Sequence, residues 1–260
     1  MTQKVSPTRA FSDLVRLMEI LRKECPWDRE QTPESLKDLM VEEVYEAIDA
    51  IDRKQWNELA KELGDMLLHI VFQSEMAKEA SHFDIGDVVY LIQEKLIRRH
   101  PHVFADLEVH DTSEVLQNWE QIKKKEDPQR SILHGVPGAL PGLIRSQRMQ
   151  EKAAGVGFDW PDWQGAWEKL EEELEELKTT LSKEDLQHKQ EEFGDVLFSL
   201  VNVGRYFGLN AEDALRMTNA KFQRRFEHIE KRVKERGKEF QDLSLEELDV
   251  FWDEAKSLHL

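Results

Sequence analysis

The sequence contains one pattern of acidic residues twice, and the two copies lie 130 residues apart. The first copy consists of Glu42, Glu43, Glu46, Glu62 and Asp65. The second copy has the same residue types at equal spacing: Glu172, Glu173, Glu176, Glu192 and Asp195. Around both copies, apolar residues recur every three or four positions, which is the period of an amphipathic helix. The pattern therefore predicts a duplication of a whole helical domain rather than a short-period repeat.

A segment rich in proline and glycine separates the two copies. Residues 128–142 read PQRSILHGVPGALPG, and such a segment cannot form a continuous helix. Alternating apolar residues, which are typical of strands, are nearly absent from the chain. We therefore predict an all-α fold, a tandem repeat of helical-bundle domains. The domains are expected at residues 1–127 and 143–260, with residues 128–142 as the linker. Helices are expected to start at Thr32-Pro33, at Ser113 with an end near Asp127, and at Lys183. Ser244 and Glu247 have the spacing of a capping box at the start of the last helix.

The spacing of the carboxylates predicts that they converge. Each copy lies on two helices joined by a short turn, centred near Lys54 in the first copy and Glu184 in the second. Residues at equal distances from the turn of a helical hairpin lie at equal height. The residues expected to face each other are Glu46 and Glu62, Glu43 and Asp65, Glu176 and Glu192, and Glu173 and Asp195.

Four converging carboxylates repel one another unless some are protonated or a cation lies among them. Oxygen ligands of this kind suit Mg²⁺, which usually also shares the phosphates of a substrate. No histidine is expected in either cluster, which disfavours zinc. A single EExxE motif is more typical of a solvated helix face, but two matched clusters in two domains favour a metal site.

Two further expectations concern the helices that carry the clusters. The apolar residues that follow each aspartate are expected in the core: Leu67, Leu68, Ile70, Val71, Val196, Leu197, Leu200 and Val201. Gly64 and Gly194 interrupt these helices, where glycine costs roughly 1 kcal/mol. A close approach of two helices beside the metal would explain both glycines.

Basic and aromatic residues also recur in both halves. The pairs at i and i+4 are Lys95 with Arg99, Lys221 with Arg225, Trp119 with Lys123, and Trp252 with Lys256. Lysine and arginine could neutralise phosphates, and tryptophan could stack on a base or belong to the core. Solvated surface and helix-end packing are the alternatives for each single pair.

The composition limits the classes of partner. The net charge of −17 argues against a nucleic-acid or anionic-membrane surface, which needs basic patches. Cys25 is the only cysteine, so no internal disulfide can form. The first residues lack the apolar core of a signal peptide, and the longest apolar runs are too short to span a bilayer. A cytoplasmic location is expected.

These motifs together resemble the MazG family of nucleoside triphosphate pyrophosphohydrolases, within the all-α NTP pyrophosphohydrolase superfamily. The resemblance covers essentially the full chain and includes EExxE followed by ExxD twice, CPWD, RRHPHVFAD, GFDW and KFQRRFEHIE. It implies hydrolysis of NTPs and dNTPs to the monophosphate and pyrophosphate by a homodimer. It also implies Mg²⁺ as the cofactor, with Mn²⁺ as a substitute, and a carboxy-terminal repeat that carries the main activity.

The resemblance further implies roles for individual residues. The expected metal ligands are Glu173, Glu176, Glu192 and Asp195, and Glu172 is a candidate to orient the attacking water. The residues expected to contact the nucleotide are Lys169, Asn202, Lys221, Arg225, Trp252 and Lys256. A second, weaker or vestigial set would consist of Glu43, Glu46, Glu62 and Asp65 with Lys95, Arg99, Trp119 and Lys123.

The two repeats differ seven residues after the last aspartate of each cluster. Asn202 follows Asp195 at this distance, whereas Phe72 follows Asp65. An amide can hydrogen-bond a sugar or a base edge and a phenyl ring cannot, which favours a weaker amino-terminal site. The competing hypothesis for the whole chain is a regulatory helical dimer that binds nucleotides without turnover.

Overall fold

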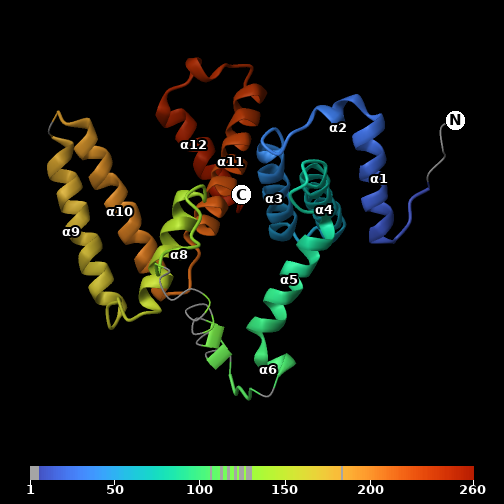
Figure 1. Ribbon diagram of the computed structural model, residues 1–260. Helices are drawn as coiled ribbons and strands as arrows, with labels where there is room; N and C mark the ends of the chain where they lie inside the picture. Colours follow the sequence, from blue (N-terminus) through green and yellow to red (C-terminus); the bar gives the residue numbers. More distant parts are fainter. Residues whose placement is uncertain are drawn as a thin grey trace. The chain divides into compact units, whose positions relative to one another are not determined.

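The computed structural model contains two compact units, Met1–Asp127 and Pro128–Leu260 (Figure 1). The structure describes residues 6–105, 107–111, 114–115, 118–119, 122, 126, 131–182 and 184–260. Within these ranges the regular elements are helices and no strand occurs, which confirms the expected all-α class. None of the helices in these ranges is both long and apolar enough to cross a membrane. Most of the helix expected at residues 113–127 lies outside the described residues.

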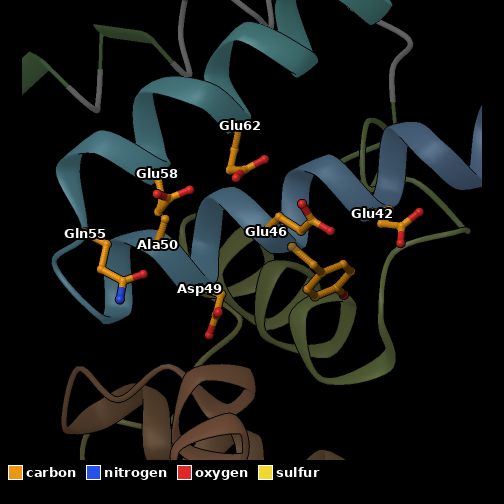
Figure 2. A pocket seen from close by; sticks show the side chains of 8 residues that line it. Glu42, Glu46, Asp49, Ala50, Gln55, Glu58 and Glu62 are labelled. Atoms are coloured by element: carbon orange, nitrogen blue, oxygen red, sulfur yellow. The ribbon is translucent and has the colours of Figure 1, made fainter.

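The described helices of unit 1 are arranged around a hairpin of α3 and α4. They are α1 (Phe11–Glu24), α2 (Pro26–Glu30), α3 (Lys37–Asp52), α4 (Trp56–Glu79), α5 (Ile85–Arg99) and α6 (Pro101–Phe104). Figure 2 shows α3 and α4 side by side, with carboxylates projecting from both. The turn between them contains Lys54, whose φ of 56° lies in the left-handed region. Helix α1 packs against α4 on the side of the core.

The predicted helix start at Thr32 was wrong. Thr32 and Ser35 bond each other reciprocally, because each side-chain oxygen accepts the other residue's backbone N–H, at 3.0 and 3.2 Å. These bonds stabilise a turn, and the regular helix α3 begins at Lys37.

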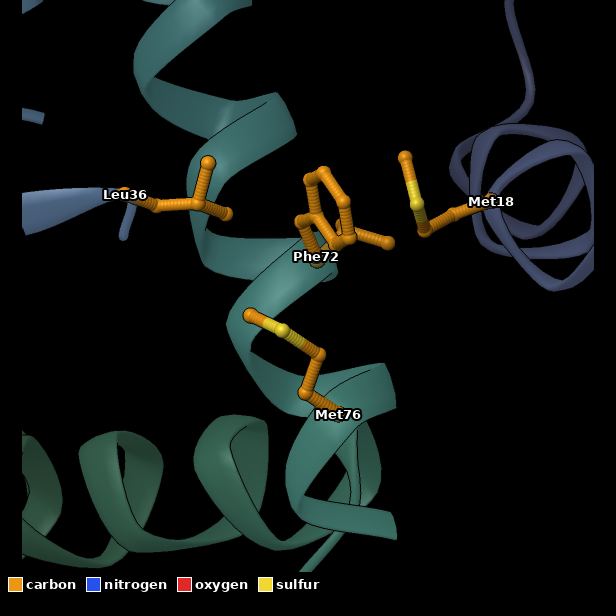
Figure 3. Packing of buried hydrophobic residues seen from close by; sticks show 5 residues of the cluster. Met18, Leu36, Phe72 and Met76 are labelled. Carbon is orange, nitrogen blue, oxygen red and sulfur yellow. The ribbon is translucent and has the colours of Figure 1, made fainter. Parts of the chain in front are cut away.

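The core of unit 1 is built from α1, α4 and the residue before α3. Met18, Leu36, Val71, Phe72 and Met76 are all at least 95% buried and pack together (Figure 3). Phe72 occupies the centre of this group, which assigns it a structural role.

Unit 2 repeats this order around a hairpin of α9 and α10. Its described helices are α8 (Gly142–Ala154), α9 (Trp163–Leu181), α10 (Leu186–Tyr206), α11 (Ala211–Glu235), the 3₁₀ helix η1 (Phe240–Asp242) and α12 (Leu245–Ser257). One core cluster joins α9 to α10 through Ala166, Leu170 and Val203. Another joins α11 to η1 and α12, and includes Ile229 and Phe251.

Side-chain caps fix the helix starts in unit 2. The carboxylates of Asp162 and Asp185 accept backbone N–H groups at the starts of α9 and α10. Ser244 and Glu247 form the predicted capping box at the start of α12. These bonds satisfy N–H groups that have no partner within a helix. Helix α10 accordingly begins just after Asp185, rather than at residue 183 as expected.

The expectation for the apolar residues beside the clusters was partly wrong. Val71 and Val201 are buried, but Leu67, Ile70, Leu197 and Leu200 are 37–52% exposed. A helix of a hairpin buries one face on its partner, and these four residues lie off that face. The apolar pattern therefore extends beyond the surface that one unit covers.

The expectation for the two helical glycines was also wrong. An ideal Cβ built on Gly64 or Gly194 would meet no atom within 4 Å among the described residues. No close helix approach explains these residues. The glycine that does permit a close approach is Gly165, which lies against the Trp160 ring.

Candidate functional site

The second repeat brings three of its expected metal ligands together. Carboxylate oxygens of Glu173 and Glu176 on α9 and Glu192 on α10 lie within 4.8 Å of one another. Asp195 does not join this group, so its role as a ligand stays a prediction. Glu173 is buried and its Oε1 lies 2.8 Å from Nζ of Lys169, which also lies 2.9 Å from Glu172.

In this cluster the acidic side chains outnumber the basic side chains that contact them. Burial raises the pKa of Glu176, and the nearby carboxylates of Glu173 and Glu192 raise it further. The pKa of Lys169 is raised, because Glu173 and Glu172 accept hydrogen bonds from its ammonium group. One lysine therefore offsets part of the charge of several converging carboxylates.

The surroundings of one Glu192 oxygen show whether the cluster could hold a cation. Its Oε2 is buried and has no hydrogen-bond partner among the described residues. A buried carboxylate oxygen without a partner is costly. A divalent cation with oxygen ligands would satisfy this atom and reduce the repulsion. The residues of the cluster therefore fit a divalent metal ion.

The first repeat contains a similar cluster. Carboxylate oxygens of Glu43, Glu62 and Asp65 lie within 4.8 Å of one another. Burial raises the pKa of Glu62, followed by repulsion from Glu46 and by a hydrogen bond with that residue. Burial and the charge of Asp65 likewise raise the pKa of Glu43. These contacts agree with the expected pairing of Glu46 with Glu62 and Glu43 with Asp65.

A cleft of about 430 Å³ extends from this first cluster toward the hairpin turn (Figure 2). Its lining consists of Glu42, Tyr45, Glu46, Asp49, Ala50, Gln55, Glu58 and Glu62. A cleft with so many carboxylates repels an anion that arrives without a cation.

Histidines beside the clusters were missed in the sequence. Nε2 of buried His69 lies 3.9 Å from Glu43, and Nδ1 of His188 lies 3.5 Å from Glu192. Both histidines lie beside the clusters, but neither belongs to the groups of converging ligand atoms. Burial lowers the pKa of His69. A signal was available, because His69 follows Asp65 by four residues and His188 precedes Glu192 by four.

The expected nucleotide contacts on α11 and α12 form a group of their own. The Arg225 guanidinium lies 5.5 Å from the centre of the Trp252 ring, and its Nε donates to the carbonyl of Leu260 at 2.8 Å. Lys256 pairs with Asp253 at 2.9 Å, and Lys221 lies one turn before Arg225. No hydrogen bond or ion pair in the described part of unit 2 joins these cations to the α9 and α10 carboxylates, so their role stays a prediction.

The corresponding cations of unit 1 are partly neutralised. Arg99 pairs with Glu126 at 2.6 Å, and Arg98 pairs with the same carboxylate at 2.9 Å. The hydrogen bond from Arg99 is the main reason that the pKa of Glu126 falls to about 2. Trp119 packs edge-on against the ring of His100. Lys95 lies on α5, and Lys123 lies outside the described residues.

Asn202 has partners that the sequence did not indicate. Arg205 donates a hydrogen bond to the Asn202 amide and forms an ion pair with Asp159, in the loop before α9. Arg205 and Asp159 are 46 residues apart in the chain, so periodicity gave no signal for this contact.

The fold and the acidic centres define a class of protein, an all-α hydrolase with carboxylate clusters on helical hairpins. The chain belongs to the MazG family, because the profile of the MazG nucleotide pyrophosphohydrolase domain matches residues 31–104 and 164–230. This membership confirms the expected family and the expected enzyme class, a nucleoside triphosphate pyrophosphohydrolase.

Three relatives illustrate the similarity. "Nucleoside triphosphate pyrophosphohydrolase/pyrophosphatase MazG" of Thermotoga maritima is 44% identical over 250 residues, which cover 95% of each chain. "Nucleoside triphosphate pyrophosphohydrolase" of Escherichia coli strain K12 is 42% identical over 94% of this chain and 95% of its own. "Uncharacterized protein YabN" of Bacillus subtilis is 47% identical over 89% of this chain, but over 48% of its own length.

Proposed function

We propose that the chain hydrolyses NTPs and dNTPs to the nucleoside monophosphate and pyrophosphate, with Mg²⁺ held in unit 2. The observation that carries the metal assignment is the converging group of Glu173, Glu176 and Glu192, with a buried Glu192 oxygen that lacks a partner. Asp195, one turn after Glu192 on α10, would complete the ligand set. The names of the relatives support the substrate class. Mn²⁺ would substitute for Mg²⁺, because it also accepts carboxylate ligands.

The reaction breaks the bond between the α and β phosphates when water attacks the α-phosphorus. A divalent ion held by these carboxylates would neutralise phosphate charge and lower the pKa of water. Glu172 lies one residue before Glu173, and its side chain is 57% exposed. This exposed carboxylate would orient the attacking water. Lys169 would hold the carboxylates of Glu172 and Glu173 in position, because its ammonium group contacts both.

The cations of α11 and α12 would bind the leaving pyrophosphate and the nucleotide. Lys221 and Arg225 share one helix face, and Arg225 lies over Trp252. These residues belong to a different part of unit 2 from the carboxylates. We propose that a homodimer forms, supported by the exposed apolar side chains of Leu197 and Leu200 beside the acidic cluster. A cytoplasmic location completes the proposal.

The amino-terminal site would be weaker. It retains its carboxylates, but Phe72 belongs to the core and Arg99 is already paired with Glu126. A triphosphate would have to compete with that carboxylate for the arginine. These two differences support unit 2 as the main catalytic unit.

The test is pyrophosphate release from dNTPs by the purified full-length chain. Release should require Mg²⁺ or Mn²⁺ and should cease in excess EDTA. Glu176→Ala should reduce the rate more than about 100-fold, because changes outside the ligand shell alone cost about 10- to 100-fold. Glu175→Ala is the matched control, since Glu175 is 68% exposed and pairs with Lys178. Turnover in EDTA would refute the metal assignment, and binding without turnover would favour the regulatory alternative.

A further inference from the structure

The orientation of the Asn202 amide is fixed by its neighbour. Asn202 is 93% buried on α10, and its Oδ1 accepts a hydrogen bond from Nε of Arg205 at 3.1 Å. A guanidinium group has donors and no acceptor. The amide atom that faces Arg205 must therefore be the oxygen. Among the described residues Nδ2 of Asn202 has no hydrogen-bond partner, so its N–H groups remain available.

Arg205 is itself held firmly. Its guanidinium makes two bonds to the Asp159 carboxylate, at 2.5 and 2.9 Å, and stacks 4.6 Å from the centre of the Tyr206 ring. The Tyr206 hydroxyl donates to Asp159 at 2.6 Å. Burial opposes the ionisation of Asp159, but the bonds from Arg205 and Tyr206 keep its pKa below the usual value. A guanidinium with these contacts cannot turn to release the Asn202 oxygen without breaking several charge-assisted bonds.

The position of Asn202 suits the nucleoside part of the substrate. Asn202 follows Asp195 by seven residues, which is almost two helical turns, so both residues lie on one face of α10. The rise along the helix places them about 10 Å apart. A triphosphate at the carboxylates can therefore extend its sugar and base toward the Asn202 amide.

Unit 1 lacks this arrangement. The residues 130 positions earlier than Asn202, Arg205 and Tyr206 are Phe72, Glu75 and Met76. Arg22 from α1 covers the Phe72 ring at 5.7 Å and pairs with Glu79 at 2.5 Å. In unit 1, therefore, an arginine from α1 covers a phenyl ring that has no hydrogen-bond donor.

We propose that Arg205 is a positioning residue that directs the Nδ2 donors of Asn202 toward an oxygen or nitrogen acceptor on the sugar or base of the nucleotide. This inference rests on the proposed function, because it assigns a contact to the same substrate. It makes Asp159, which holds the Arg205 guanidinium through two bonds, an indirect determinant of nucleotide affinity.

The decisive variant is Asn202→Asp. A carboxylate still accepts the Arg205 bond, so the contacts with Asp159 and Tyr206 remain, but the donor to the nucleotide is lost. We expect the affinity for a dNTP analogue with a non-hydrolysable α–β bridge, measured with Mg²⁺ by calorimetry, to fall about tenfold or more. Inorganic triphosphate lacks sugar and base, and its affinity should not change. An equal loss for all four bases would indicate a sugar contact, and a base-dependent loss would indicate a base edge.

A second comparison separates positioning from simple stabilisation. Arg205→Gln leaves the Asn202 amide free to turn. It should weaken binding of the analogue about threefold or more and leave binding of inorganic triphosphate unchanged. Tyr206→Phe is the control, because it removes one bond to Asp159 and keeps the Arg205–Asn202 bond. It should lower the melting temperature without changing analogue affinity. Equal loss of affinity in both variants would mean that Arg205 acts only on stability and would overturn the proposal.

The remaining outcomes are also decisive. The proposal is wrong if Asn202→Asp binds the analogue as tightly as the parent does. It is also wrong if the variant loses as much affinity for inorganic triphosphate as for the analogue, because Asn202 then does not contact the nucleoside. A parent that binds the analogue but releases no pyrophosphate would refute the proposed hydrolysis while leaving these affinity comparisons valid. A parent that binds neither ligand would refute both proposals.

Discussion

Replacing Gly165 with alanine is expected to destabilise unit 2, although alanine favours helices. The new Cβ would lie 2.4 Å from Cδ1 and 2.8 Å from Cγ of Trp160, whereas carbon atoms pack best at about 3.5–4.0 Å. The ring must therefore move by about 1 Å or more. The backbone around it resists, because the Trp160 carbonyl lies 2.9 Å from the Tyr206 hydroxyl, which also contacts Asp159.

The magnitude follows from two opposing effects. Overpacking of this kind costs about 1–3 kcal/mol, and the gain in helix propensity is about 1 kcal/mol. The free energy of unfolding of unit 2 should therefore fall by up to about 2 kcal/mol. Gly194→Ala is the matched control, since its Cβ meets no described atom within 4 Å. It should raise the free energy of unfolding by about 1 kcal/mol, or about 2–4 °C in melting temperature.

The assay is urea unfolding followed by circular dichroism, with separate transitions fitted if the two units unfold independently. The double variant Trp160→Ala with Gly165→Ala completes a cycle that isolates the contact. Removing the ring should make Gly165→Ala neutral or stabilising. If Gly165→Ala is as stable as Gly194→Ala in the presence of Trp160, the close contact does not exist and the reasoning fails.

Three further predictions concern the acidic clusters. Mg²⁺ should raise the melting temperature because it binds the folded state. Combined Glu173→Gln and Asp195→Asn substitutions should remove most of this increase. If the increase persists in the double variant, the ion binds elsewhere. Asp195→Asn should abolish most pyrophosphate release and Asp65→Asn should leave most of it, whereas equal losses would indicate two working sites. Without metal, the free energy of unfolding should fall as pH rises above the usual glutamate pKa, because the folded-state pKa values of Glu43, Glu62 and Glu176 are raised and protonation favours the native state in that window. Urea titrations at several pH values should show that the free energy of unfolding depends less steeply on pH in Glu176→Gln than in the parent. An unchanged pH dependence would mean that Glu176 does not contribute to it.

The carboxylate clusters could be predicted from the sequence because their geometry is local. The helical period fixes which face each residue occupies, and a short turn fixes the heights of Glu43 and Asp65 relative to each other. The same rules would have indicated His69, one turn after Asp65. The capping box of Ser244 and Glu247 was likewise predictable, because both its hydrogen bonds span three residues.

Contacts between distant segments could not be predicted. Periodicity marks Leu197 and Leu200 as apolar, but it does not show whether anything covers them. The Arg205–Asp159 pair depends on a loop folding back onto α10. The pairing of Arg99 with Glu126 joins residues 27 positions apart, and spacing alone favoured a free arginine that could bind phosphate.

The ion pairs Arg22–Glu79 in unit 1 and Arg205–Asp159 in unit 2 have a consequence for recombination between the duplicated halves. In unit 1 the cation lies on α1 and its carboxylate, Glu79, on α4; in unit 2 the cation lies on α10 and its carboxylate, Asp159, before α9. A genetic crossover between the halves would create one hybrid with both Arg22 and Arg205 and no carboxylate partner for either. The reciprocal hybrid would carry Glu79 and Asp159 without an arginine. Because removing the partner of a buried charge is destabilising, we expect such recombinants to fold less stably than either parent half.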